Sequence, residues 1–148
     1  MLPINQGELI FRLILAVILG FILGWERHRI HKPASYKTLI LVALGSALFS
    51  ILSFLGTQER GYGLNVTQIA AGIVTGIGFL GAGAIIRAGG DILGLTTAAS
   101  IWLTAAVGMA AGFGWYLLAI VTTALVVMVL YFLERCEYQD QEKNQEKM

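Results

Sequence analysis

Five long stretches of the chain are almost free of charged residues. They cover residues 9–25, 38–56, 67–86, 95–112 and 115–133, and Arg12 is the only charged residue inside them. Each stretch has the length that an α-helix needs to cross a hydrocarbon core about 30 Å thick. The stretches do not alternate polar and apolar residues as barrel strands do, so the pattern predicts an all-α membrane protein, a bundle of about five transmembrane helices.

The predicted helices form one domain. We expect residues 1–133 to form the transmembrane helical domain and residues 134–148 to form a short polar cytoplasmic tail. Only Phe113-Gly114 separates the last two apolar stretches, so one long kinked helix or a re-entrant pair is the alternative at that point.

Composition and charge support the membrane assignment and suggest an orientation. The chain is 57% hydrophobic and 13% charged, whereas about 25% of the residues in a soluble domain are charged. With five spans, eight basic residues outside the spans fall on one side and only Arg60 on the other. The eight are Arg27, Arg29, Lys32, Lys37, Arg87, Arg135, Lys143 and Lys147. Basic residues favour the cytoplasmic side, so we expect the N-terminus outside and the C-terminus in the cytoplasm.

Glycines are concentrated in the third stretch, where Gly76, Gly78 and Gly81 match the dinucleotide-binding pattern G-x-G-x-x-G. That site needs a preceding strand and an acidic residue about 20 positions later, and neither surrounds these glycines. Small residues also let helix backbones approach one another in lipid. Gly72, Gly76 and Gly83 share one helical face, and Gly78 and Gly81 widen it. The pattern predicts a central helix that contacts two or more neighbours; an unwound segment lining a cavity is the alternative.

The same small-residue spacing occurs on two other predicted helices. Gly20 and Gly24 lie four residues apart in the first, and Gly108 and Gly112 in the fourth. We expect these residues to serve helix packing. Such faces make a homodimer plausible, although the same faces could pack within one bundle.

Two charged residues in the first helix are candidates for a function. Arg12 either extends to the outer headgroups or turns inward and pairs with Glu8, four residues earlier. Glu26 lies at the C-terminal end of the helix, where the helix dipole disfavours an anion. We therefore expect a cationic partner for Glu26, with Lys37 or Arg87 as candidates, in a structural or a functional ion pair.

The two loops on the basic side suggest contacts with anions. Residues 26–37 contain four basic residues, which indicate a topology anchor and a contact for anionic lipid headgroups. Gly89-Gly90 predicts a turn, and Thr96 or Thr97 is expected to cap the fourth helix. Free amides there, with Arg87 nearby, would suit an anion; a capped helix with an outward-pointing arginine is the alternative.

No arrangement in the sequence predicts catalysis. Both histidines, His28 and His31, lie in one loop, and two histidines without a third ligand make a weak metal site. We expect no enzyme activity, no cofactor, no metal site and no nucleic-acid partner.

Two motifs together resemble the MgtC/SapB family of bacterial membrane proteins: G-x-x-x-G-x-E-R at residues 20–27 and G-I-G-F-L-G-A-G at residues 76–83. Further positions match the family pattern, namely Lys32, Pro33, Ala34, Thr38, Gly94, Leu95, Thr97, Ala98, Ala99 and Trp102. The chain departs from the family pattern at three positions. Ser35 replaces a glycine, Lys37 replaces an arginine, and Thr96 replaces an asparagine that some members have. The chain resembles a short form that holds only the membrane domain.

The resemblance implies a multi-pass protein of the bacterial inner membrane, linked to growth under magnesium limitation and, in pathogens, to survival in host cells. It also implies a modulator of membrane potential or of the F-type ATP synthase, which would be a partner. We therefore expect a non-catalytic regulator that uses its glycine-rich face and its cytoplasmic basic residues. The alternative is a transporter or channel for magnesium or another ion, in which glycine carbonyls line a pore.

Overall fold

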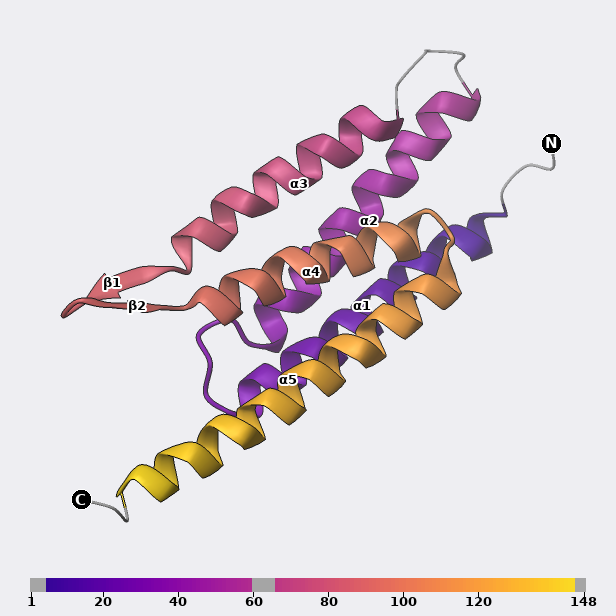
Figure 1. The fold of residues 1–148 in the computed structure, drawn as a ribbon. Coiled ribbons are helices and arrows are strands. Elements are labelled where there is room, and N and C mark those ends of the chain that lie inside the picture. The colour runs from indigo at the N-terminus through magenta and orange to yellow at the C-terminus, as the bar shows by residue number, and fades with distance from the viewer. Residues whose placement is uncertain (1–4, 60–65, 146–148) are drawn as a thin grey trace.

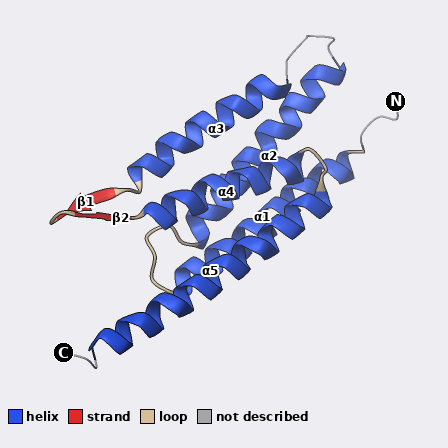
Figure 2. Ribbon diagram, in the orientation of Figure 1, coloured by secondary structure: helices blue, strands red, loops and turns tan. Residues whose placement is uncertain are grey.

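The structure, a computed structural model, describes the backbone of residues 5–59 and 66–145 and the side chains of residues 5–57 and 67–132. This part of the chain forms five helices and one short hairpin (Figures 1 and 2). The elements are α1 (Gln6–Arg29), α2 (Tyr36–Glu59), α3 (Val66–Gly83), β1 (Ile86–Ala88), β2 (Asp91–Leu93), α4 (Leu95–Gly112) and α5 (Tyr116–Gln145). The predicted all-α class is confirmed.

Each apolar stretch of the sequence coincides with one helix. By length and composition, α1, α2 and α4 can each cross a membrane. The apolar parts of α3 and α5, Thr67–Gly83 and Tyr116–Phe132, are shorter. The orientation relative to a membrane stays a prediction. Four of the basic residues on which that prediction rests lie outside the described side chains. These are Arg60, Arg135, Lys143 and Lys147.

Successive helices run in opposite directions, so the bundle has two distinct ends (Figure 1). The α1–α2 connection and the β1–β2 hairpin lie at one end, which we call the basic end. The first turn of α1 and the α4–α5 turn lie at the other, which we call the N-terminal end. Because α5 starts at Tyr116 and runs back beside α1, α4 and α5 are separate helices rather than one kinked helix.

The core lies between α1, α2 and α4. Small and branched side chains fill it: Ala16, Leu19 and Leu23 from α1, Leu39, Ala43 and Ala47 from α2, and Ala105, Val107 and Ala111 from α4. Helix α3 lies along the outside of this group, against α2 and α4 (Figure 1). The prediction that the glycine-rich third helix contacts two neighbours is therefore confirmed, whereas the prediction that it is central is wrong.

The hairpin contains the predicted turn. Gly89 and Gly90 have φ angles of 62° and 99°, which a non-glycine residue rarely adopts. Two such residues in a row form the tight turn that suits a two-residue hairpin. The flanking strands pair in antiparallel register, with Ile86 opposite Leu93. These strands were not predicted, and α3 ends at Gly83 rather than at residue 86.

Candidate functional site

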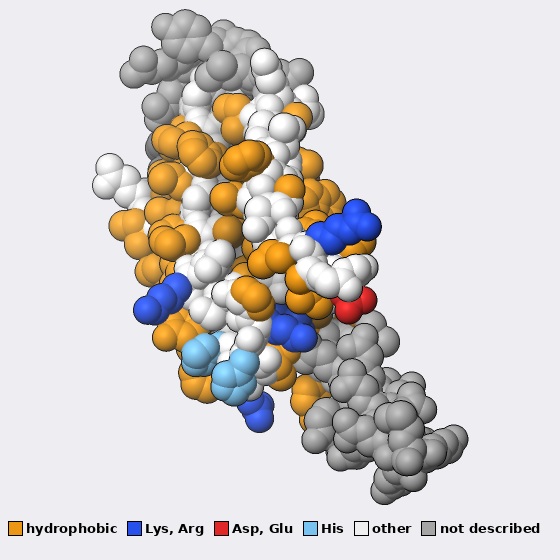
Figure 3. All heavy atoms as spheres, turned by 90° about the vertical axis from the view of Figure 1, so that its left-hand side faces the viewer, with side chains coloured by type: hydrophobic (Ala, Val, Ile, Leu, Met, Phe, Trp, Pro, Cys, Tyr) orange, Lys and Arg blue, Asp and Glu red, His pale blue; other side chains and the backbone are white. Residues whose placement is uncertain are grey.

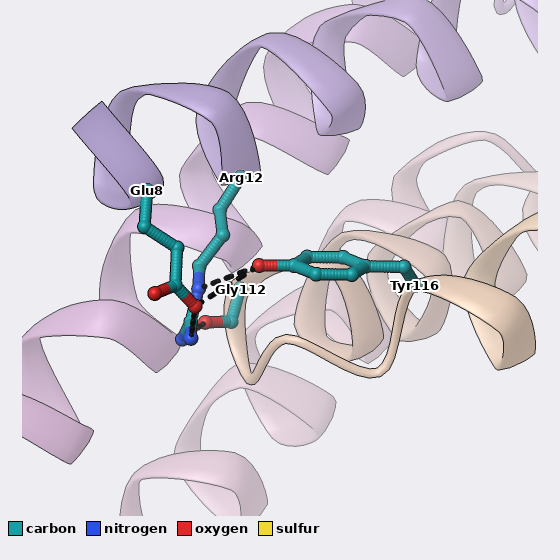
Figure 4. Close-up of polar contacts among 4 residues, drawn as sticks. All are labelled: Glu8, Arg12, Gly112 and Tyr116. Carbon is teal, nitrogen blue, oxygen red and sulfur yellow. Dashed lines mark hydrogen bonds and ion pairs between the residues drawn. The ribbon is translucent and has the colours of Figure 1, made fainter. Parts of the chain in front are cut away.

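Arg12 lies inside the bundle near its N-terminal end, with 6% of its surface exposed. Its guanidinium pairs with Glu8 and donates to the Gly112 carbonyl at 2.9 Å and to the Tyr116 hydroxyl at 3.3 Å (Figure 4). The Tyr116 hydroxyl in turn donates to Glu8 at 3.2 Å. Of the two interpretations of Arg12, the structure therefore has the inward-facing arginine paired with Glu8.

The position of Gly112 explains why an arginine is stable there. Gly112 is the last residue of α4, and the last carbonyls of a helix lack partners within that helix. A cation is favoured at this negative end of the helix dipole. Gly114 has a φ of 83°, and a Cβ on it would lie 2.9 Å from Arg12 Nη2. The glycine thus turns the chain and leaves room for the guanidinium, which ties α1 to the α4–α5 turn.

Glu26 has a cationic partner, as predicted, but the partner is its neighbour Arg27 rather than Lys37 or Arg87. Arg27 Nε donates to one carboxylate oxygen at 2.6 Å and Nη2 to the other at 3.1 Å. Arg27 is fully buried. Adjacent residues usually point apart on a helix, but the long arginine side chain folds back to its neighbour. The carboxylate thus supplies the opposite charge that a buried guanidinium needs.

The N-terminus of α4 also differs from the prediction. The N-cap residue is Gly94, with a φ of 89° and no side-chain cap, so neither Thr96 nor Thr97 caps the helix. Thr97 is 2% exposed and belongs to the interior, whereas Thr96 is exposed. A Cβ on Gly94 would lie 3.1 Å from the carbonyl carbon of Ala84. Both the positive φ and this close approach require glycine, which decides where the helix starts.

Lys37 and Arg87 lie on the surface at the basic end. Lys37 is in the first turn of α2, and Arg87 is in β1 opposite Ile92. Neither side chain forms a hydrogen bond or ion pair with another described residue. Figure 3 shows Lys, Arg and His side chains gathered around this end. Among the described residues, no group of three His, Cys, Asp or Glu could hold a metal ion.

Four of the predicted packing glycines lie in tight contacts between α1, α2 and α4. A Cβ on Gly20 would lie 2.9 Å from the Leu39 carbonyl oxygen, and one on Gly24 would lie 2.8 Å from the Tyr36 nitrogen. On α4, a Cβ on Gly108 would lie 2.9 Å from Ala43 Cα, and one on Gly112 would lie 2.8 Å from Ala47 Cα. Backbone meets backbone at all four positions, so any side chain there would force the helices apart.

The glycines of α3 have different surroundings. A Cβ on Gly72, Gly76, Gly78 or Gly83 would meet nothing within 4 Å among the described atoms. Only Gly81 faces a neighbour, at an ordinary 3.7 Å from the Ala98 Cβ of α4. The structure therefore does not bring this glycine face into the bundle.

A group of hydroxyls lies in the interior and was not predicted there from the sequence, although one member, Thr97, was named as a possible helix cap. The members of the group on α2 and α4 are Ser46, Ser50, Ser53, Thr97, Ser100 and Thr104. Ser50 donates to the Ser46 carbonyl at 2.8 Å and Thr104 to the Ser100 carbonyl at 2.7 Å. These bonds stay within one helix. The spacing of four and three residues along α2 was the signal that marked this buried face.

Tyr116 was also missed as a partner of Arg12. In the sequence it belongs only to an aromatic group at the end of an apolar stretch, and 104 positions separate it from Arg12. No local pattern could have joined the two residues.

Comparison with known proteins points to one family of bacterial membrane proteins. A sequence model of the MgtC family matches residues 13–139. The chain is 43% identical over 142 residues to an Escherichia coli K12 protein named "Putative magnesium transporter YhiD", covering 93% of this chain and 66% of that protein. It is 42% identical over 114 residues to "Protein MgtC" of Brucella abortus, covering 77% and 46%. It is 37% identical over 145 residues to "Protein SrpB" of Synechococcus elongatus, covering 89% and 80%.

The chain spans less than two thirds of the length of the first two of these relatives. No solved structure matches it.

Proposed function

This chain belongs to the MgtC family, and we propose that it is a non-catalytic regulator of the bacterial inner membrane that acts by contact with another membrane protein. In this proposal all five helices cross the membrane. The basic end faces the cytoplasm, as the distribution of Lys and Arg favours. The outer surface of α3 receives a helix of the partner.

The observation that carries the proposal is the contrast between a closed centre and an open third helix. Between α1, α2 and α4, glycine contacts bring backbones together and leave no space for an added methyl group. An ion would need a polar path, but the hydroxyls of Ser50, Ser100 and Thr104 donate to carbonyls of their own helices. The centre is therefore suited to rigidity rather than to conduction.

The outer surface of α3 suits helix contact. Ala71, Thr75, Gly78 and Ala82 are exposed and follow one another at spacings of four, three and four residues. Residues at these spacings share one face of a helix. Small residues on such a face let a second backbone come close, which is how helices associate in lipid. This face, which we call the outer α3 face, is our candidate contact surface.

Magnesium transport is the competing function, because the E. coli relative is named a putative magnesium transporter. Flux of magnesium into proteoliposomes containing the purified chain separates the two. We expect no flux above that of empty vesicles. Robust flux that is lost in a correctly folded Arg87→Ala variant would refute the regulator.

The proposal itself is tested by site-specific photo-crosslinking in bacterial inner membranes that contain F-type ATP synthase. A crosslinking residue in place of Thr75 should capture a membrane protein. The same residue in place of Ile18, which is 48% exposed on α1, is the control and should capture none. Gly78→Leu should reduce capture from position 75 without changing the thermal stability of the chain.

Each outcome has a definite meaning. An adduct with the ATP synthase or another membrane protein at position 75 alone supports regulation by contact. An adduct with a second copy of the chain assigns the outer α3 face to a homodimer and refutes the regulator contact. Equal capture at both positions also refutes it.

A further inference from the structure

A groove of about 750 Å³ lies between α2 and α3, on the side of α3 away from the outer α3 face. Its lining is almost entirely apolar. The glycine positions Gly45, Gly72 and Gly76 line it, and a Cβ on any of the three would meet nothing within 4 Å. At these three positions α2 and α3 lie too far apart for an added methyl group to contact the facing helix.

One end of the groove carries a positive charge. Lys37 and Thr38, in the first turn of α2, line it at the basic end. Lys37 is exposed and makes no ion pair with the described residues. Other basic side chains, among them Arg29 and Arg87, are exposed around the same end (Figure 3). The groove thus offers an apolar wall with a single cation at its end.

The length of the groove matches one leaflet of a bilayer. Along α2 its lining extends from Lys37 to Phe49, which is about 18 Å at about 1.5 Å per residue. Half of a hydrocarbon core of about 30 Å is about 15 Å. The length therefore favours one lipid tail with its headgroup at Lys37.

A second groove repeats this arrangement. It lies between α4 and α5, has a volume of about 660 Å³, and is lined by Lys32 together with apolar and hydroxyl residues. On α4 its lining extends from Leu95 to Leu103, in the half of the helix nearer the basic end. Both grooves thus combine one lysine with an apolar wall in the same half of the bundle.

We propose that the α2–α3 groove binds an anionic phospholipid of the leaflet at the basic end, with the phosphate at Lys37 and one acyl chain over Gly45, Gly72 and Gly76. The inference rests on the membrane placement given above but not on the regulator role. Apolar burial holds the tail, and the lysine selects the charge of the headgroup. The α4–α5 groove, with Lys32, is a second site of the same kind.

The test is native mass spectrometry of the purified full chain in detergent, titrated with phosphatidylglycerol or with phosphatidylcholine of the same acyl chains. We expect tighter binding of phosphatidylglycerol. Lys37→Gln should reduce the preference about fivefold, since one lysine near a membrane surface contributes about 1 kcal/mol. Gly76→Leu should weaken binding of both lipids roughly tenfold, because its side chain takes the space of about two methylene groups of the tail.

Gly78→Leu is the matched control, since it makes the same substitution on the same helix outside the groove. It should leave lipid binding unchanged while it reduces partner capture, whereas Gly76→Leu should do the reverse. Equal binding of the two lipids by the native chain would overturn the proposal. So would native-like lipid binding by Gly76→Leu, or a dimer that Gly76→Leu abolishes, which would place a second copy in the groove.

Discussion

Gly108 and Gly112 on α4 share their four-residue spacing with Gly72 and Gly76 on α3, yet their surroundings are opposite. The α4 pair touches the backbone of α2, whereas the α3 pair faces open space. In lipid, apolar surfaces do not drive helices together, because lipid tails are equally apolar. A small-residue pattern therefore indicates where another molecule or helix can come close to the backbone. Whether a helix, a lipid or nothing lies there depends on the rest of the structure.

The largest expected loss of stability comes from adding a side chain at a glycine that contacts the backbone of α2. Gly108→Leu should lower the free energy of unfolding by more than about 3 kcal/mol, because a Cβ would already lie 2.9 Å from Ala43 Cα. Thermal denaturation in detergent measures the effect. Gly76→Leu, at a site with nothing within 4 Å, is the control. Equal melting temperatures for the two variants would contradict the distinction.

A smaller loss of stability is expected when the hydrogen-bond network of Arg12 at the N-terminal end of the core is removed. Arg12→Met removes the bonds to Gly112 and Tyr116 and should cost about 2 kcal/mol of unfolding free energy. The loss stays below that of a fully buried ion pair because the Glu8 side chain is 44% exposed and can be solvated. Tyr116→Phe, which removes only part of this network, should cost less. If both variants melt at the same temperature, Arg12 does not have the role assigned to it.

The smallest expected effects compare two glycines within α3. Gly81→Leu should cost about 1–2 kcal/mol of unfolding free energy because Gly81 faces Ala98 at ordinary contact distance. Gly78→Leu should change it by less than about 0.5 kcal/mol. Unfolding of the two purified variants is compared by circular dichroism. A Gly78→Leu variant that is less stable than Gly81→Leu would show that the outer α3 face is covered within the chain.

Several local features were predictable because their causes are local. Apolar length alone located the five helices, and Gly89-Gly90 located the hairpin turn. Glu8 and Arg12 were recognised as a possible pair from their four-residue spacing. The N-cap of α4 was not predicted correctly, because a glycine is required at position 94 by the close approach of Ala84 as well as by the positive φ of Gly94. A cationic partner for Glu26 was expected from the helix dipole, but its identity was not, because adjacent helical residues normally diverge and only the long side chain of Arg27 lets it fold back to Glu26.

The sequence by itself determined the membrane environment, the helices and the turn after α3, because apolar length, helical spacing and glycine chemistry act within a few residues. The tertiary structure decided which glycines are buried, which way Arg12 points and where the grooves lie. Those outcomes depend on residues far apart in the chain, such as Arg12 and Gly112, which are 100 positions apart. Since many helix pairs can pack equally well in lipid, only the whole set of contacts selects one arrangement, with α3 left open on its outer face.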